Sequence, residues 1–369
     1  MSSDVNSAAV RPRRPLFTAS GLVCGAALLL GITGVLTIAS GSPNWHGADM
    51  LFFKQVLFLF FGFIVMSASA ALPFRFWRRC ALPLGIAGVL VLWFLPLFGI
   101  RVNGMCGWLN CGGLYLQPSE IMKTPFLLVL TAITVRRAAG SRRGFAEAFL
   151  WTLLWVIPIV LQPDFGTAAV YGMFFAVSYF VTGGKLRYLA LPLCAGVAAS
   201  AAFVWRHPYA WRRICAFIDP ASDPLGSGWH ARQFELAIAR GHFFGVKLGG
   251  AVWSGNYLPY AYNDSAVATL LETLGLAGGF LTMALLVLLA AAMWRLAEHA
   301  EADDKRVFIT GAMLLIVIQS MVHVGVNLCL LPTTGLTMPF ISYGGSSLTS
   351  CFWLAGVALS AAKHTENKE

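Results

Sequence analysis

The stretch "LLPTTGLTMPFISYGGSSL", Leu330 to Leu348, lies between two strongly apolar runs near the end of the chain. It contains two prolines, three glycines and several hydroxyl side chains, which favour turns and interrupt a helix. Its flanks look like membrane helices, whereas the stretch itself does not. The chain must therefore have a use for polar, turn-forming residues at the end of a membrane helix.

The composition supports the membrane setting of that stretch. Of 369 residues, 58% are hydrophobic and 11% are charged, and the mean hydropathy is +0.72. These values are typical of multi-span helical membrane proteins and rare among soluble ones. Apolar runs recur, each long enough to cross about 30 Å of hydrocarbon. The run at 17–39 is too long and too rich in glycine for an ordinary secretory signal. We expect an all-α polytopic membrane protein.

Ten apolar runs predict ten transmembrane helices with one large extracytoplasmic loop between the seventh and the eighth. The predicted spans lie near residues 17–39, 51–72, 82–99, 119–136, 146–162, 167–183, 187–205, 266–294, 306–330 and 345–362.

Charge placement predicts the orientation of these spans. Basic residues gather in alternate turns, which the positive-inside rule assigns to the cytoplasm. These residues are Arg75, Arg78, Arg79, Arg136, Arg137, Arg142, Arg143, Lys185, Arg187, Arg295, Lys305 and Arg306. The predicted plan is a cytoplasmic tail at 1–15, a membrane domain at 16–362 with its outer loop at 206–265, and a cytoplasmic tail at 363–369.

The large outer loop is itself basic. Its cations are Arg206, Arg212, Arg213, Arg232, Arg240 and Lys247. Long loops cross the membrane largely regardless of charge, so these cations leave the topology unchanged. Two interpretations remain open for the loop: a solvated segment with some headgroup contacts, or a cradle for an anionic, phosphate-bearing ligand.

Most of the eight cysteines fall inside predicted spans, where they act as small apolar residues. Cys106 and Cys111 share one outer loop, and an oxidising compartment would permit a disulfide between them. The cysteines and histidines show no metal-ligand spacing.

Ionisable groups at membrane depth are costly, and each is a candidate for function. In "LYLQPSEIMK", Glu120 and Lys123 fall on one helical face, either as a structural ion pair or as a pair that positions a ligand. In "LQPDFGT", proline and glycine interrupt a helix, which membranes tolerate where the backbone is buried in protein or lines a wet cavity. Asp164 suits a helix cap there, and a cap at an outward cavity also suits a substrate.

Two further patterns lie near the end of the large loop and beyond it. Asp264 and Glu272, eight residues apart, are predicted to share a face of the next span. A carboxylate beneath a basic loop suits general-base chemistry, with burial raising its pKa and nearby arginines lowering it. Gln319, His323 and Asn327 form a polar stripe at i, i+4 and i+8, which predicts hydrogen bonds between helices.

Four ordered motifs together resemble one known family. "GWLNCGGLYLQPSEIMK", "LQPDFGTA", "NDSAVATLLETLG" and "LPTTGLTMPFISYGGSS" are similar, in order and spacing, to the signatures of the SEDS family, the FtsW/RodA group of bacterial division, shape and sporulation proteins. The ten-span topology agrees across nearly the whole chain. "PDFG" and "PFISYGG" favour the division-type FtsW branch.

The resemblance implies a peptidoglycan glycosyltransferase that polymerises lipid II at the outer face of the bacterial cytoplasmic (inner) membrane. The stretch around residue 340 would then be a re-entrant loop lining the substrate cavity. The substrate contacts implied by the matching motifs are Trp108, Glu120, Lys123, Asp164, Arg212, Arg213, Ser342, Tyr343, Gly344, Gly345 and Ser346.

Asp264 matches the family's loop aspartate, which implies the role of general base toward the acceptor sugar. Lys123, Arg212, Arg213 or a divalent cation (Mg²⁺ or Mn²⁺) would balance the leaving diphosphate. Glu120, Asp164 and Asp264 are the candidate cation ligands, and no organic cofactor is expected.

The implied partners are lipid II, a class B penicillin-binding transpeptidase and proteins of the divisome or elongasome, with no nucleic acid. The sequence also departs from the family pattern. Gly107 stands where Arg is usual, with Arg101 as a substitute, and the other departures are Asn263, Ser265, Thr273 and His323. Two alternatives remain: a lipid II flippase, or a catalytically weak scaffold that recruits the transpeptidase.

Overall fold

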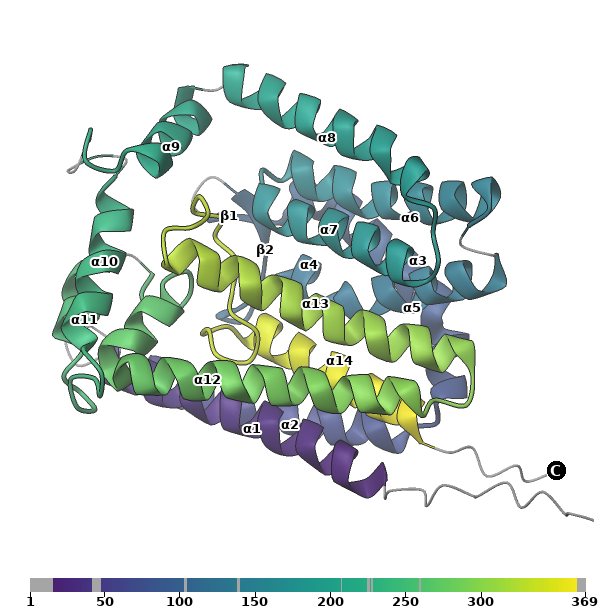
Figure 1. Ribbon diagram of the computed structural model, residues 1–369, viewed down its shortest axis with the longest axis horizontal. Helices are drawn as coiled ribbons and strands as arrows, with labels where there is room; N and C mark the ends of the chain where they lie inside the picture. Colours follow the sequence, from purple (N-terminus) through teal and green to yellow (C-terminus); the bar gives the residue numbers. More distant parts are fainter. Residues whose placement is uncertain are drawn as a thin grey trace, which may run out of the picture.

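The computed structural model describes residues 16–41, 48–102, 105–137, 140–206, 208–223, 226, 228–258 and 260–363. Figure 1 shows long, roughly parallel helices with a group of short helices at one end of the bundle. The predicted tail at 1–15 and nearly all of that at 363–369 lie outside the described residues.

The described part of the chain contains a helix at each of the ten predicted spans. The long helices are α1 (Leu16–Gly41), α2 (Ala48–Ala71), α3 (Phe74–Phe98), α6 (Arg142–Leu161), α7 (Phe165–Val181), α8 (Leu186–Arg206), α12 (Ala266–Glu298), α13 (Asp303–Asn327) and α14 (Gly345–Ala362). The fourth span is divided into α4 (Pro118–Ile121) and α5 (Lys123–Arg136). Seven helices (α1, α2, α3, α6, α12, α13 and α14) are long and apolar enough to cross a membrane, whereas α7 and the start of α8 are shorter apolar helices.

One predicted boundary was wrong. The third span was expected to begin at residue 82, but α3 starts at Phe74, directly after Pro73. Arg75, Arg78 and Arg79 therefore lie in the first turns of α3. The sequence stretch is polar enough to look like a turn, yet Trp77 of the same segment is buried against the bundle, and this burial keeps the segment helical.

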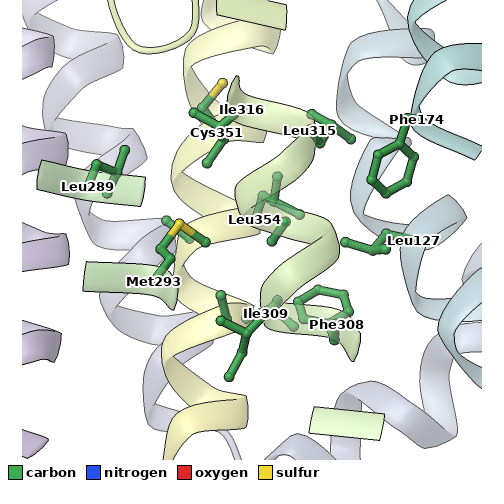
Figure 2. Packing of buried hydrophobic residues seen from close by; sticks show 14 of the residues in the cluster. Leu127, Phe174, Leu289, Met293, Phe308, Ile309, Leu315, Ile316, Cys351 and Leu354 are labelled. Carbon is green, nitrogen blue, oxygen red and sulfur yellow. The ribbon is translucent and has the colours of Figure 1, made fainter. Parts of the chain in front are cut away.

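The core lies between α12, α13, α14 and the helices around them. The most extensive helix pairings are α14 with α2 and α1 with α12. Figure 2 shows Leu315 of α13 facing Leu127 of α5 and Phe174 of α7, and Leu354 of α14 lies beside them. All four side chains are essentially buried. Close dispersion contact of this kind is what holds membrane helices together, because lipid tails are as apolar as the side chains.

A small antiparallel sheet follows α3, which the prediction of an all-helical chain did not include. It is formed by β1 (Ile100–Val102), β2 (Met105–Cys111) and β3 (Leu114–Leu116), paired in that order. Gly112 and Gly113 join β2 to β3 with φ of +64° and +88°. A two-residue hairpin turn requires these positive φ values, and a Gly-Gly pair supplies them readily.

The sheet excludes the predicted disulfide. Cys106 and Cys111 lie on the single strand β2 and both are free thiols. Five residues of extended strand separate their Cα atoms by about 16 Å, and a disulfide requires less than about 7 Å. The disulfide prediction was wrong because the segment is an extended hairpin and not a compact loop.

The large outer loop contains three short helices. They are α9 (Pro208–Ile218), α10 (Trp229–Gly241) and α11 (Val252–Tyr257). α9 packs on α8, whereas α10 packs on α12 and α11 packs on α1, α10 and α12. In Figure 1, α8 and α9 run along one edge of the molecule, and α10 and α11 close its outer end. The loop therefore has one half fixed to the bundle and one half fixed to an edge helix.

α12 is broken near its outer end. Gly275 has φ of +66° and ψ of −169°, which is outside the helical region and accessible mainly to glycine. The segment before the break is almost entirely buried, and the segment after it carries the exposed apolar side chains of a membrane span. The break separates an outer structural piece of α12 from its transmembrane piece.

Candidate functional site

A buried ion pair lies where α4 meets α5. Lys123 Nζ donates to Glu120 Oε1 at 2.6 Å and to Gln319 Oε1 of α13 at 2.8 Å. Both charged side chains are only 3% exposed. The ion pair that the three-residue spacing predicted is confirmed, and it ties the fourth span to α13.

Asp164 caps α7, as the sequence indicated. Its Oδ1 accepts from the backbone N–H of Thr167 at 3.0 Å, and Gln117 Nε2 donates to its Oδ2 at 3.1 Å. One turn further along α7, the hydroxyl of Tyr171 donates to the carbonyl of Ser119 at 2.8 Å. These bonds fasten the start of α7 to the segment that carries Glu120. Sequence reasoning missed Gln117, although it belongs to the same "QPSE" run.

The polar stripe of α13 connects these charges to the rest of the outer end. Gln319, His323 and Asn327 are each at most 1% exposed. Gln319 Nε2 donates to the Thr337 carbonyl at 2.8 Å, and His323 Nδ1 donates to the Leu336 carbonyl at 2.6 Å. The predicted interhelical role is confirmed in part: the stripe bonds to the loop after α13 as well as to neighbouring helices.

Asn327 holds the start of α12. Its Nδ2 donates to the carbonyl of Asp264 at 2.9 Å, and its Oδ1 accepts from the N–H of Ala268 at 3.0 Å. One amide side chain therefore spans the turn before α12 and the first turn of the helix. This contact was not predicted, since nothing in the spacing of α13 indicates which segment lies opposite.

The segment 332–344 folds back into the bundle. Leu336, Met338, Phe340 and Ile341 are each at most 4% exposed, although the segment contains no long helix or strand. Two of its backbone carbonyls accept hydrogen bonds from Gln319 and His323 of α13. The expected re-entrant loop is therefore present in the described structure.

The re-entrant segment approaches two of the candidate carboxylates. A side chain at Gly166, two residues after Asp164, would collide with the carbonyl of Thr334. Gly335 has φ of +70°, and a Cβ at that position would lie 3.7 Å from Asp264 Oδ2. Residues 334 and 335 therefore lie between the start of α7 and the carboxylate of Asp264, which brings Asp164 and Asp264 to the same end of the bundle.

Ser342 and Tyr343 connect the re-entrant segment to the turn before α12. The Ser342 hydroxyl accepts from Met338 N at 2.8 Å and donates to the Asn263 carbonyl at 2.8 Å. Tyr343 N donates to the Tyr262 carbonyl at 2.7 Å. Ser342 is 2% exposed, so its hydroxyl serves the fold. Ser346 is equally buried, and a Cβ at Gly345 would press against the ring of Phe58.

Two tyrosines form a half-exposed aromatic wall beside Asp264. The rings of Tyr262 and Tyr343 meet edge to face, with centroids 5.5 Å apart. Partial burial raises the pKa of both phenols, and the Asp264 charge adds to the increase at Tyr262. Both hydroxyls are therefore neutral donors near neutral pH. Gly344 lies next to this wall, with φ of +154° at the start of α14.

Asp264 and Glu272 have different surroundings, contrary to the shared face that their spacing predicted. α12 begins at Ala266, so Asp264 lies in the preceding turn and is partly exposed. Glu272 is completely buried. Its carboxylate accepts from the N–H groups of Trp253 and Ser254, at 3.1 and 2.7 Å, and from Arg240 Nε at 3.4 Å.

Two basic residues of the large loop, Arg240 and Arg212, lie on different parts of the structure, and the cradle for an anionic ligand stays a prediction. Arg240 is engaged by Glu272, and its guanidinium lies 5.8 Å from the ring centroid of Trp253. Arg212 is exposed on α9, which packs on α8. The side chain of Arg213 lies outside the described part of the structure. Among the candidate cations whose side chains the structure describes, Lys123 is bonded within the site, to Glu120 and Gln319.

Strand β2 forms another edge of the outer end. Trp108 is partly buried, and its Nε1 is enclosed without a hydrogen-bond partner among the described atoms. A Cβ at Gly107 would lie 3.4 Å from Met105 and 3.7 Å from Gln162 Oε1, so a methyl group fits at this position. The register of β1 against β2 sets Arg101 across from Cys106 and Gly107.

The described residues contain no group of three or more His, Cys, Asp or Glu side chains that could hold a metal ion. Glu120 Oε1 is neutralised by Lys123, and Asp164 is bonded to Gln117 and Thr167. Glu120 Oε2 is buried and has no partner in the part of the chain described here. The protein side chains alone therefore do not match the ligand set of Mg²⁺ or Mn²⁺.

The arrangement suits proton transfer at a site that solvent can reach at this end of the bundle. A partly exposed carboxylate, Asp264, is held by its backbone through Asn327 and lies against the re-entrant segment. Neutral phenols flank it, and a buried ion pair lies deeper in the same network. A fixed carboxylate within reach of solvent and of a polar ligand is the requirement for a general base.

Comparison with known proteins gives a consistent result. The FtsW/RodA/SpoVE family, described as "Cell cycle protein", matches residues 20–367. A probable peptidoglycan glycosyltransferase FtsW of Pseudomonas fluorescens is 33% identical, with 94% of this chain and 89% of the relative covered. The FtsW of Thioalkalivibrio sulfidiphilus is 35% identical, over 95% of this chain and 90% of that protein.

Solved structures agree with the sequence relatives. A peptidoglycan synthase complex that coordinates polymerization and crosslinking contains a chain with a TM-score of 0.79 and 28% identity, covering 94% of this chain and 97% of the other. The rod shape determining protein RodA of Thermus thermophilus matches with a TM-score of 0.69 and 26% identity, over 93% and 95% of the two chains. This multi-pass membrane protein belongs to the FtsW/RodA/SpoVE family, the SEDS family that its four motifs indicated.

Proposed function

We propose that this chain is a peptidoglycan glycosyltransferase that polymerises lipid II at the outer face of the bacterial cytoplasmic membrane. Relatives about one third identical over nearly the whole chain are named as probable peptidoglycan glycosyltransferases. The observation that carries the proposal is the closeness of the Asp264 carboxylate to Gly335 of the re-entrant segment, at the end of the bundle that also holds Glu120, Lys123 and Asp164.

In the proposed reaction, Asp264 accepts the proton of the acceptor sugar's 4-hydroxyl. That oxygen attacks the anomeric carbon of the donor and displaces the undecaprenyl diphosphate, and inversion of the α-linked donor gives a β-linked glycan. Asn327 holds the backbone of Asp264 in place, and Tyr262 and Tyr343 border the sugar. A divalent cation bound together with the diphosphate stays a prediction, and no step here depends on it.

The distribution of buried charge supports a polymerase over a flippase. Glu120, Lys123 and Asp164 lie in one network at the outer end, and the described interior below them is packed with Leu127, Phe174 and Leu315. Alternating access requires binding groups near the midplane that can face either side in turn. We find no such set of ionisable groups in the described inner half of the bundle, where Lys305 is bonded at the opposite end of α13.

The proposed partner is a class B penicillin-binding transpeptidase within the divisome or elongasome. Its support is the structural similarity to a chain of a complex that couples polymerization to crosslinking. The proposed topology places both termini in the cytoplasm, because the basic turns at the other end of the bundle obey the positive-inside rule.

The decisive experiment compares Asp264→Asn with Asp219→Asn, an exposed aspartate of the same outer loop. Each purified variant is incubated with labelled lipid II and the candidate transpeptidase, and glycan strands are separated by electrophoresis. We expect Asp264→Asn to lose on the order of 10²-fold or more in rate, the range for a positioned general base, and Asp219→Asn to retain it. Undiminished polymer from Asp264→Asn would remove the general-base assignment.

A further inference from the structure

The last residue of α10 and the chain that follows it, residues 241–250, form a connection toward α11 that presents two adjacent phenylalanines to the outside. Phe243 is 52% exposed and Phe244 is 80% exposed, and their rings meet edge to face at 4.8 Å. Leu248, a few residues on, is 62% exposed. Three large apolar side chains on a ten-residue connection outside the spans form an apolar patch that requires a partner surface.

The backbone of this connection prevents the phenylalanines from turning inward. It is inserted into the break of α12: Leu276 N donates to the His242 carbonyl at 3.1 Å, and Ala277 N donates to the Phe243 carbonyl at 2.9 Å. On the other side of the break, Val246 N donates to the Glu272 carbonyl at 3.0 Å. The connection supplies the backbone partners that the broken helix lacks, and its side chains are held outward as a result.

Glycines make this insertion sterically possible. A Cβ at Gly241 would collide with the carbonyl of Leu271, and one at Gly245 would collide with that of Thr273. Gly245 and Gly275 also have positive φ, +81° and +66°. The connection and the outer piece of α12 are therefore in direct backbone contact and move as one unit.

The break of α12 lies at the level of the membrane surface. Residues 276–298 alone give a helix of about 34 Å, enough to cross the roughly 30 Å hydrocarbon layer. Leu276 and Phe280, the first exposed side chains of this piece, are 46% and 68% exposed. The backbone hydrogen bond from Ala277 to Phe243 places the two segments side by side, so the apolar patch of the connection continues the lipid-facing surface of α12.

The charges of the connection suit a lipid surface. Arg240, His242 and Lys247 surround the patch, and residues 240–250 include no acidic residue. Lys247 and His242 are exposed. Aromatic side chains beside basic ones are the pattern of segments that lie at the headgroup level, where the rings enter the acyl boundary and the cations meet phosphates.

We propose that residues 243–248 insert into the outer leaflet of the membrane and anchor the large loop to phospholipid. Phe243, Phe244 and Leu248 enter the acyl boundary, and Lys247 contacts phosphate. The anchor fixes the distance of the loop from the membrane surface. Because Val246 N donates to the Glu272 carbonyl, the anchor also fixes the position of the outer piece of α12. A consequence that depends on the proposed function is that the anchor also sets the height of Asp264 above the lipid-embedded substrate.

The direct test is photocrosslinking in nanodiscs of phosphatidylethanolamine and phosphatidylglycerol. A benzoylphenylalanine replaces Phe244 in one full-length variant and Ala221, in the polar part of the same loop, in a control. Mass spectrometry should find phospholipid adducts at position 244 and not at 221. The proposal is overturned if position 244 forms no lipid adduct, or if adding the transpeptidase replaces the lipid adduct by a protein crosslink.

The second measurement compares two environments for one variant, Phe243→Ser/Phe244→Ser. We expect its polymerisation rate to fall on the order of threefold or more in vesicles, since apolar burial drives interfacial anchoring, and to match wild type in detergent. Equal loss in both environments means that the phenylalanines serve the fold, and the anchor is then rejected. Lipid crosslinking does not depend on activity, so a failure of the proposed glycosyltransferase function would leave the anchor testable.

Discussion

Asp264 and Glu272 are both carboxylates near the start of α12, but their surroundings differ. Glu272 is completely buried and bonded by two backbone N–H groups and an arginine, and it joins α12 to α11 and α10. Asp264 is partly exposed and lies before the helix, and its carboxylate is close to Gly335 of the re-entrant segment. The comparison teaches that a buried, fully bonded carboxylate holds the scaffold, whereas the carboxylate that we propose as the general base is the one that solvent can reach.

The largest expected effect separates these two roles. Glu272→Ala leaves buried N–H groups and Arg240 without their acceptor, and we expect a loss of about 3 kcal/mol in the free energy of unfolding. Asp264→Ala removes a partly exposed side chain and should cost about 1 kcal/mol or less. Thermal unfolding of both variants in detergent measures the difference. Equal destabilisation would contradict the division of roles.

Asn327 offers a way to disturb Asp264 without touching its side chain. Asn327→Leu removes the bonds to the Asp264 carbonyl and to Ala268 N, both buried, and should cost about 2 kcal/mol of stability. We also expect the polymerisation rate to fall about tenfold, since small displacements of a catalytic group are costly. Ser320→Ala, on the same helix with a hydroxyl that has no partner among the described atoms, is the control and should change neither quantity.

Gly335 tests the contact between the re-entrant segment and Asp264. Gly335→Ala places a methyl group near Asp264 Oδ2 and forces alanine to φ of +70°, at a cost of about 1 kcal/mol. Gly249→Ala is a matched control, because Gly249 has φ of +81° with open space around it. Both variants should lose similar stability, but Gly335→Ala alone should lose activity. Similar rates for the two would show that the re-entrant segment does not shape the Asp264 site.

The smallest effect concerns the edge formed by β1 and β2. Gly107→Arg should preserve the polymerisation rate or raise it a few-fold, since a Cβ at this buried position meets Met105 and Gln162 only at ordinary contact distances and a guanidinium forms charge-assisted hydrogen bonds. Arg101→Ala should lower the rate if the arginine across the sheet serves in its place. A folding defect in Gly107→Arg, seen by size-exclusion chromatography, would show that this edge has diverged from the family.

Much of the scaffold could be predicted because hydrophobic length has a direct physical meaning in a membrane. In the hydrocarbon layer the backbone N–H and C=O groups must hydrogen-bond within the protein, so apolar runs such as those of α1 and α13 are expected to form helices. The cap at Asp164 and the ion pair of Glu120 with Lys123 were also predictable, since both depend on residues close in sequence. The Gly112-Gly113 pair is a recognisable hairpin signal in the sequence, although an all-α fold was predicted there.

Other features depend on which segments meet in space. The i, i+8 spacing of Asp264 and Glu272 suggested one shared face, but a helix start at Ala266 placed them in different environments. The arginines of the large loop are close together in the sequence, but Arg212 lies on α9, which packs on α8, and Arg240 is paired with Glu272 of α12. Loop residues carry no periodicity that would reveal their partners.

The sequence by itself determined that this chain is an all-α, multi-pass membrane protein of the FtsW/RodA/SpoVE family, because the length of the apolar runs and the four motifs are local properties. Only the tertiary structure decided that Asn327 holds the backbone of Asp264, that Gly335 lies close to the Asp264 carboxylate, that Glu272 joins the outer loop to α12, and that residues 241–250 fill the break of α12. These depend on contacts between segments tens to hundreds of residues apart, and such contacts are set by packing and by the need to satisfy every buried polar group.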